Sequence, residues 1–214
     1  MKKIKNKILI LIVKLILKIH SFCYRLISVL AKKLEQQGIH PKHKLIGYHR
    51  FFTDNITDND RVLDIGCGNG ALTFDLAKKA KKVVGIDLNK KNIEIAREKF
   101  FRENIEYIHG DALKNCPKEK FDVVVLSNIL EHLPNRTEFL KSLKDKVDKF
   151  LIRVPMINRD WLTLYKKELG LEWRADKTHH TEYTLESFKE ELARAGLNLK
   201  EYSIQFGEIW AIIY

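Results

Sequence analysis

The stretch VLDIGCGNG, residues Val62–Gly70, decides the fold. Val62–Ile65 is suited to a buried β-strand, three glycines follow at the spacing G-x-G-x-G, and a segment with helical periodicity covers about 71–80. Glycine lets the backbone turn sharply and approach a ligand closely because no Cβ intervenes. Strand, glycine-rich turn and helix in this order predict a ligand-binding loop at one edge of a parallel sheet.

Outward from this loop, short β-branched runs alternate with amphipathic stretches. We expect strands at 61–65, 82–87, 105–109, 121–127 and 148–154, and helices at about 71–80, 90–102, 135–146, 157–169 and 184–195. The tail differs, because the strand-like runs 197–206 and 208–214 are separated only by Gly207. The pattern predicts an α/β fold with a doubly wound, parallel sheet that ends in an antiparallel hairpin.

The glycine spacing and nearby acids indicate the kind of ligand. G-x-G-x-G differs from the dinucleotide pattern G-x-G-x-x-G, and Asp64 would repel a phosphate yet could hold a cationic or amino-bearing group. Asp87, at the next strand end, can accept hydrogen bonds from ribose hydroxyls, and Asp111 follows the third strand. Three acids on consecutive strand ends predict one crevice at the carboxyl edge of the sheet.

Four motifs in order, VLDIGCGNG (62–70), VVGIDLN (83–89), HGDA (109–112) and FDVVVLSNILEHL (121–133), resemble those of class I S-adenosylmethionine-dependent methyltransferases. The resemblance covers about residues 45–214. It implies a Rossmann-like, seven-stranded, mostly parallel sheet with an antiparallel last strand, and S-adenosyl-L-methionine as cofactor. A nicotinamide-binding Rossmann domain is the alternative, and the glycine spacing and the terminal hairpin argue against it.

The same resemblance implies a set of cofactor-binding residues. Those expected at the methionine moiety are Asp64, Gly66, Cys67, Gly68, Asn69 and Gly70, with Ser127 and Asn128 beside the sulfonium. Asp87 is expected at the ribose. Leu88 and Ala112 would flank the adenine, and Asp111 would accept from its amino group.

The methyl acceptor is indicated less directly. No Asn/Asp-Pro-Pro-Tyr/Phe motif follows the fourth strand, which argues against DNA-adenine and glutamine N-methyltransferases. The arrangement H-x-x-E-Y-T before the last helix resembles the acceptor loop of small-molecule, glycan or lipid members of the family. It makes His179 a candidate general base, or alternatively a residue that only orders the loop, and places His180 and Tyr183 in acceptor binding. His132 is the second catalytic candidate, either reacting or shaping the pocket.

The N-terminal region carries all the net charge. Residues 1–50 hold twelve Lys or Arg and one acid, which accounts for the net charge of +11, so the remainder is neutral. Residues 1–36 form a basic amphipathic helical arm, and 37–56 a linker and cap with Tyr48 as a substrate contact. Residues 57–214 form the methyltransferase domain. His40, His43 and His49 lack a fourth ligand for zinc, so no metal is expected.

Three basic residues inside the apolar run of the arm disfavour a membrane span, and the helix suits an anionic membrane surface. Packing of its apolar face on the domain, or on a second copy in an oligomer, is the alternative. Three widely spaced cysteines suit a reducing compartment. The prediction is a cytoplasmic, peripherally membrane-associated enzyme that O-methylates a lipid, a lipid-linked glycan or a quinone-like molecule. An RNA methyltransferase and a non-catalytic cofactor-binding partner protein are the alternatives, although nucleic acid is disfavoured because the arm lacks interleaved aromatics.

Overall fold

The computed structural model describes residues 2–34 and 41–214. They divide into two compact units. The N-terminal unit contains the described residues up to Tyr48 together with Asp160–Trp173, and the sheet unit contains His49–Arg159 and Arg174–Tyr214. The predicted boundary between arm and cap, at residues 36 and 37, lies outside the described residues, as does His40.

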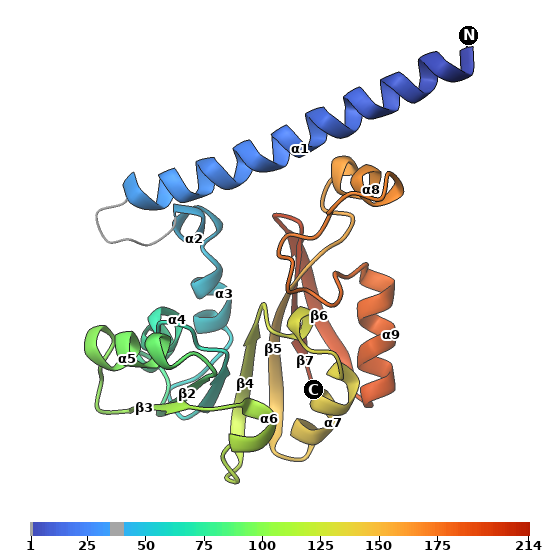
Figure 1. The fold of residues 1–214 in the computed structure, drawn as a ribbon. Helices are drawn as coiled ribbons and strands as arrows, with labels where there is room; N and C mark the ends of the chain where they lie inside the picture. The colour runs from blue at the N-terminus through green and yellow to red at the C-terminus, as the bar shows by residue number, and fades with distance from the viewer. Residues whose placement is uncertain (1, 35–40) are drawn as a thin grey trace. The chain divides into compact units, whose positions relative to one another are not determined.

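The sheet unit is built on a seven-stranded sheet in the order β3-β2-β1-β4-β5-β7-β6 (Figure 1). The strands are β1 Arg61–Ile65, β2 Lys82–Asp87, β3 Ile105–His109, β4 Phe121–Ser127, β5 Val147–Pro155, β6 Leu199–Gln205 and β7 Glu208–Ile213. The first five are mutually parallel, and β7 pairs antiparallel with both β5 and β6. This confirms the predicted doubly wound sheet with a terminal hairpin. Since β1 to β4 are parallel, their carboxyl ends meet at one edge.

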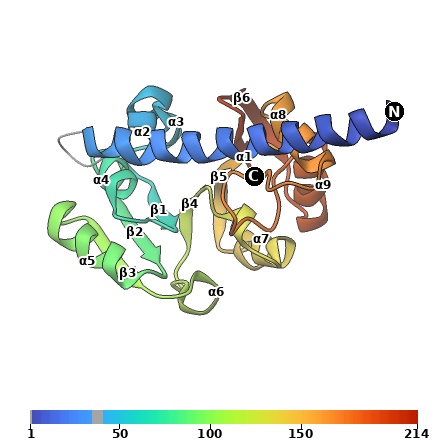
Figure 2. The same cartoon turned by 45° about the horizontal axis from the view of Figure 1, so that its top comes forward.

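Helices cover both faces of this sheet. They are α3 Tyr48–Asp54, α4 Ala71–Ala77, α5 Lys90–Lys99, α6 Ala112–Asn115, the 3-10 turn η1 Leu130–His132, α7 Arg136–Lys144 and α9 Leu185–Ala195. In both views α4 and α5 lie beside β2 and β3, whereas α7 and α9 lie together at the other half of the sheet (Figures 1 and 2). The sequence did not predict α3, α6 or η1, because elements of three to seven residues are too short for a periodic pattern.

The core explains the strand prediction. One cluster joins the inward side chains of five strands to Phe139 and Leu140 of α7 and to Phe188 and Leu192 of α9. A smaller cluster beneath α5 contains Cys67 and Tyr107. Central strands buried on both faces read as continuous apolar runs, which is why β4 was recognisable from sequence.

The start of α9 is closed by a capping box. The Thr184 side chain accepts from the Ser187 backbone N–H, and the Ser187 hydroxyl accepts from the Thr184 N–H. This reciprocal pair fixes the loop that carries His179–Tyr183 to the helix.

The N-terminal unit contains α1 Lys2–Leu34, α2 Pro41–Ile46 and α8 Trp161–Glu168. Leu17 is buried and lies on one line of α1 with the half-buried Lys14, Ser21 and Ser28. Val13 and Ala31 are also half-buried, and the remaining residues of 6–34 are exposed. The exposed large apolar side chains of α1 are Ile8, Leu9, Ile10, Leu11, Ile12, Leu15, Ile16, Ile19, Phe22, Tyr24, Leu26, Ile27, Val29, Leu30 and Leu34. No helix within the described ranges combines the length and hydropathy that crossing a bilayer requires.

Candidate functional site

The glycine loop is held against the end of β2. The N–H groups of Gly66 and Cys67 donate to the Ile86 carbonyl at 2.8 and 3.1 Å. Two of the glycines are required by packing. At φ +71° a Cβ on Gly66 would lie 1.9 Å from Ile129 Cδ1, and at φ +87° a Cβ on Gly70 would lie 2.6 Å from the Tyr107 hydroxyl.

Gly68 differs from both, since at φ +56° its missing Cβ faces open space. The loop therefore presents bare backbone to its surroundings at the middle glycine, where a ligand can approach closely. The contact between Gly66 and Ile129 places the segment after β4 directly against this loop.

Asp87 links the loop to the next helix. Its Oδ2 accepts from the Gly68 N–H at 2.9 Å, and its Oδ1 accepts from the Asn89 N–H at 2.8 Å. The Asn92 side-chain amide also donates to Oδ1, at 3.3 Å. These donors fix the carboxylate beside the exposed backbone of Gly68. A carboxylate has about four acceptor positions, so one remains for a ribose hydroxyl.

Asp64 lies below the loop and is 1% exposed. The Thr73 hydroxyl donates to its Oδ2 at 2.7 Å. Burial raises the pKa of Asp64 to about 6, and the Thr73 hydrogen bond opposes that rise only in part. The side chain is thus poised to take a nearby positive charge, because a cation would favour its ionised form.

Asp111, the third of the three acids, follows a residue that is bonded to Asp87 at the sheet edge: the Gly110 N–H donates to the Asp87 carbonyl at 3.0 Å. Asp111 is the N-cap of α6 and accepts from the Leu113 N–H at 2.9 Å. Leu88 is 71% exposed and Ala112 is half-buried. Acidic and apolar side chains thus lie side by side at the ends of β2 and β3. The sequence predicted that these residues lie at one edge of the sheet, and the structure places them there.

After β4 the chain turns through Asn128, whose φ is +57°. Its N–H donates to the Arg153 carbonyl at 2.8 Å, whereas its side-chain oxygen Oδ1 is buried with no hydrogen-bond partner among the described residues. Ser127 is half-buried at the end of β4. Asn tolerates the left-handed region better than most residues, so the turn is compatible with this sequence.

A cluster of titratable side chains follows this turn. The rings of His132 and His179 meet edge to face with centroids 4.6 Å apart. The Glu131 carbonyl accepts from the His180 N–H at 2.7 Å, which ties η1 to the H-x-x-E-Y-T loop. Two segments almost fifty residues apart are thereby joined beside the glycine loop. Both catalytic candidates from the sequence lie in this cluster.

Each histidine is oriented by a further group. His179 is 5% exposed, and its Nδ1 lies 2.9 Å from Glu182 Oε1; Glu182 also forms an ion pair with Arg159. His132 Nδ1 lies 3.0 Å from the Thr178 hydroxyl oxygen. Burial lowers the pKa of His132, and the neighbouring His179 lowers it further.

The cluster also contains Glu131, which the sequence pairs with His132 directly after the fourth strand, and Glu182 of the H-x-x-E-Y-T motif. Glu131 is completely buried, and neither carboxylate oxygen has a hydrogen-bond partner within the described part of the chain. Burial raises its pKa to about 8. Its position between Leu130 and His132, directly after β4, was the available signal.

The remaining predicted contacts are placed as follows. His180 is exposed, whereas Tyr183 is 1% exposed and packs edge to face on Phe188 within the core. Tyr48 belongs to the N-terminal unit, where its hydroxyl lies 2.9 Å from His43 Nδ1. Their role in acceptor binding stays a prediction.

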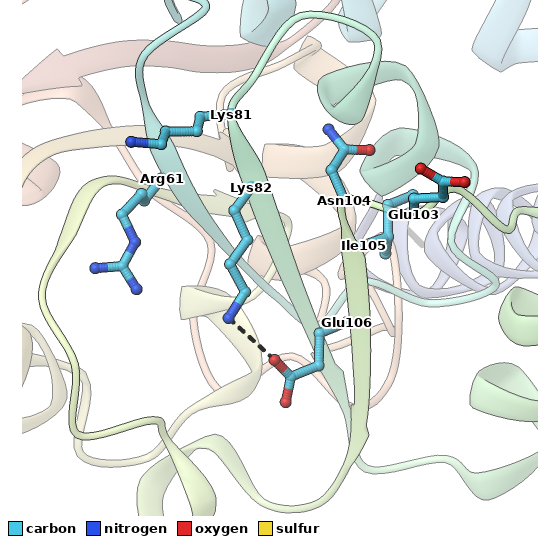
Figure 3. A pocket seen from close by; sticks show the side chains of 7 residues that line it. All are labelled: Arg61, Lys81, Lys82, Glu103, Asn104, Ile105 and Glu106. Carbon is cyan, nitrogen blue, oxygen red and sulfur yellow. Dashed lines mark ion pairs between the residues drawn. The ribbon is translucent and has the colours of Figure 1, made fainter.

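A separate hollow lies at the opposite, amino-terminal ends of β1 to β3 (Figure 3). Two of its three basic residues, Arg61 and Lys82, pair with carboxylates. Lys82 forms ion pairs with Glu106 at 3.2 Å and with Glu119 at 3.4 Å, and Arg61 also pairs with Glu119. The charges of Arg61 and Lys82 are therefore matched by carboxylates within the fold.

The chain has relatives among known proteins. A family model described as a methyltransferase domain matches residues 21–202. A ubiquinone biosynthesis O-methyltransferase of Arabidopsis thaliana, described as mitochondrial, is 33% identical over 153 residues, which are 66% of this chain and 48% of that protein. A probable ribosomal RNA small subunit methyltransferase A of Pyrococcus abyssi is 38% identical over 91 residues, which are 38% of this chain and 34% of that protein.

Among solved structures, the magnesium protoporphyrin IX methyltransferase of Synechocystis, with bound SAH, matches with a TM-score of 0.60 and 18% identity. The match covers 79% of this chain and 80% of that one. The chain spans between about a third and three fifths of the length of the curated relatives it matches.

Proposed function

The chain belongs to the class I S-adenosylmethionine-dependent methyltransferases, and from that premise we propose that it methylates a hydroxyl group of a quinone-like or other lipid-soluble molecule at a membrane surface. The observation that carries this proposal is the contact of the glycine loop with the segment that bears the histidine cluster, through Gly66 and Ile129. A cofactor seat and a group able to promote loss of a proton thereby lie side by side.

The residues at the sheet edge fit the cofactor. Open space at Gly68 and the fixed carboxylate of Asp87 suit the ribose side, and the buried Asp64 suits the positively charged methionine side. When bound, S-adenosylmethionine supplies an electrophilic methyl group on a good leaving group. The chain then has to position the acceptor in line and, for a hydroxyl, help remove its proton.

The histidine cluster favours a hydroxyl acceptor. His179 and His132 each have one ring nitrogen engaged by Glu182 or Thr178, which leaves the other nitrogen for the acceptor. Relatives that match this chain are named ubiquinone biosynthesis O-methyltransferases, a name that specifies methylation at oxygen. We therefore place the acceptor among apolar molecules that carry an acidic hydroxyl.

The exposed apolar surface of α1 supports the membrane component. Leu11, Leu15 and Ile27 are each at least 60% exposed, and exposed Lys18 and Arg25 lie on the same helix. A helix that presents both apolar and basic side chains to solvent suits the interface of an anionic bilayer. An acceptor dissolved in that bilayer would then lie close to the enzyme.

RNA methylation is the rival, because one relative is named for ribosomal RNA. Relatives named for quinone and for RNA match at similar identity, so identity does not choose between them. The charge distribution favours the lipid-soluble acceptor over RNA, since the chain beyond residue 50 holds equal numbers of acidic and basic residues. Nucleic-acid binding depends on a basic surface around the site.

The test is transfer of labelled methyl from S-adenosylmethionine to two acceptor pools, a membrane-lipid extract containing prenylated phenols and total RNA. We expect label in the lipid pool, and loss of that label in Asp87→Ala, which removes the ribose acceptor. Label that enters only RNA would overturn the acceptor class. Binding of S-adenosylhomocysteine with no transfer to either pool would favour the non-catalytic alternative.

Membrane docking is tested separately by flotation with vesicles that contain, or lack, phosphatidylglycerol. The full chain should float only with the anionic vesicles, and the double variant Leu15→Asn, Ile27→Asn should stay at the bottom of the gradient. Tyr202→Asn, which removes an exposed aromatic from β6, is the matched control and should float. Equal flotation of all three proteins would exclude α1 as the docking element.

A further inference from the structure

The cluster Glu131, His132 and His179 has the composition of a metal centre. One ligand atom from each residue can be chosen so that all three lie within 4.8 Å of one another. Two of the residues are in η1 and the third is in the loop before α9, so the fold itself, and no local run of sequence, brings them together. Ligand atoms bound to one ion at about 2 Å lie about 3.3 Å apart, a distance that side-chain rotation can reach.

Glu131 gives independent support. Its side chain is completely buried and both carboxylate oxygens are without a hydrogen-bond partner among the described residues. A buried carboxylate normally has partners, because leaving it unpaired is costly. The nearby Arg153 attracts the Glu131 carboxylate electrostatically, but it forms its ion pair with Glu208, with Nε 2.7 Å from Oε2, and gives the Glu131 oxygens no hydrogen bond. An ionised Glu131 needs donors and a protonated one needs an acceptor, whereas a bound cation would satisfy both oxygens.

The surroundings of the two histidines fit the same role. Glu182 can only accept, so at 2.9 Å it receives the Nδ1–H of His179. The Thr178 hydroxyl donates to Asp176 Oδ1 at 2.7 Å and can therefore accept the Nδ1–H of His132 at 3.0 Å. With Nδ1 carrying the hydrogen, Nε2 of each ring is the atom that offers a lone pair in the metal-binding form. Metal-binding histidines are typically oriented in this way, by a carboxylate or another acceptor on the second nitrogen.

We propose that Glu131, His132 and His179 bind one divalent transition-metal ion, with Zn²⁺ as the best match to two imidazoles and one carboxylate. Imidazole ligands favour zinc and its late first-row neighbours over magnesium or calcium. Three protein ligands leave a coordination position open, as in catalytic zinc sites. This inference rests on the proposed function for its purpose and changes how the proton is lost: with both Nε2 atoms on the ion, the acceptor hydroxyl would bind at the open position, where its pKa would be lowered.

The test uses the untagged full chain, stripped with a chelator and then titrated with Zn²⁺ against a competing chromophoric chelator. We expect one equivalent of Zn²⁺ to bind. Glu131→Gln, which keeps the side-chain shape, and His179→Gln should each weaken binding by 10-fold or more. His180→Gln, the adjacent exposed histidine, is the matched control and should bind as the wild type does.

Titration with Co²⁺ gives a second readout, because its visible absorption reports the ligands; the absorption should change in Glu131→Gln and stay unchanged in His180→Gln. Calorimetry with S-adenosylhomocysteine shows that each variant is folded. No stoichiometric Zn²⁺ in the wild type, or equal affinity in Glu131→Gln and the wild type, would overturn the metal site. Zinc binding without methyl transfer would leave the site standing and refute the proposed acceptor instead.

Discussion

Replacing Asp64 by Asn should stabilise the protein at neutral pH while weakening cofactor binding. Asp64 is 1% exposed, and the Thr73 hydroxyl can donate to the Asn amide oxygen as it does to the carboxylate. Burial raises the pKa of Asp64 from 3.8 to about 6. Folding therefore favours the protonated acid, and ionisation above the folded pKa costs stability.

The magnitude follows from that shift. At about 1.4 kcal/mol per pKa unit, a rise of this size corresponds to roughly 3 kcal/mol. Between pH 4 and 6 the folded state holds a proton that the unfolded state has released, so the wild type loses this stability as pH rises. Asn does not titrate. The advantage of Asp64→Asn over the wild type should grow by about 3 kcal/mol between pH 4 and 7 and then level off.

Urea unfolding of both proteins at several pH values measures the difference directly. Asp145→Asn, a change at the exposed C-cap of α7, serves as the control for general charge effects. Calorimetry should at the same time show affinity for S-adenosylhomocysteine reduced by about 10-fold or more, since hydrogen bonds to charged groups contribute about 1.5–3 kcal/mol. A stability difference that stays constant from pH 4.5 to 7.5 would refute the reasoning about burial.

Three further changes test other parts of the fold. Gly66→Ala should lower the free energy of unfolding in urea by about 2–4 kcal/mol, because there is no room for its Cβ. Gly68→Ala should lower it by only about 1–2 kcal/mol, because of the positive φ, and should mainly weaken cofactor binding. Equal losses in the two variants would contradict the distinction between the two glycines. Thr184→Ala should lose about 1 kcal/mol through the capping box with cofactor affinity unchanged, and an unaltered urea midpoint would show that the cap is unimportant. Iodoacetamide should label the exposed Cys23 well before Cys67, because burial raises the pKa of the Cys67 thiol; mass spectrometry of the native protein would disprove this if Cys67 reacted first.

The sheet was largely predictable because its signals are local. β1, β2, β3 and β4 begin and end where the apolar runs do, and β5 is longer by one residue at each end than the predicted strand. The glycine loop was equally easy to predict, since its glycines and Asp64 lie close together in the sequence. The last helix was placed within one residue because the capping residue Thr184 marks its start.

The histidine cluster was predictable only in part. His132 and His179 could be named from local motifs, but nothing in the sequence states that their rings meet, because they are separated by most of α7, β5 and α8. Likewise, the sequence marks Glu131 as a candidate beside His132 but does not show that its side chain is buried. Its burial follows from the hydrogen bonds that the His180 and Thr181 N–H groups donate to its carbonyl, which fold the later loop over it.

The grouping of Asp160–Trp173 with α1 and α2 had no counterpart in the sequence analysis, which assigned 57–214 to one domain. The segment leaves the sheet unit at Arg159 and returns at Arg174, and both flanking arginines are anchored in the sheet unit. Arg159 pairs with Glu182, and Arg174 Nη1 donates to the His179 carbonyl at 3.0 Å. Since Glu182 is hydrogen-bonded to His179, the contacts that anchor the inserted segment also hold the His132–His179 pair in place. A substitution at Arg174 should therefore perturb the His179 loop, because it removes the hydrogen bond to the His179 carbonyl.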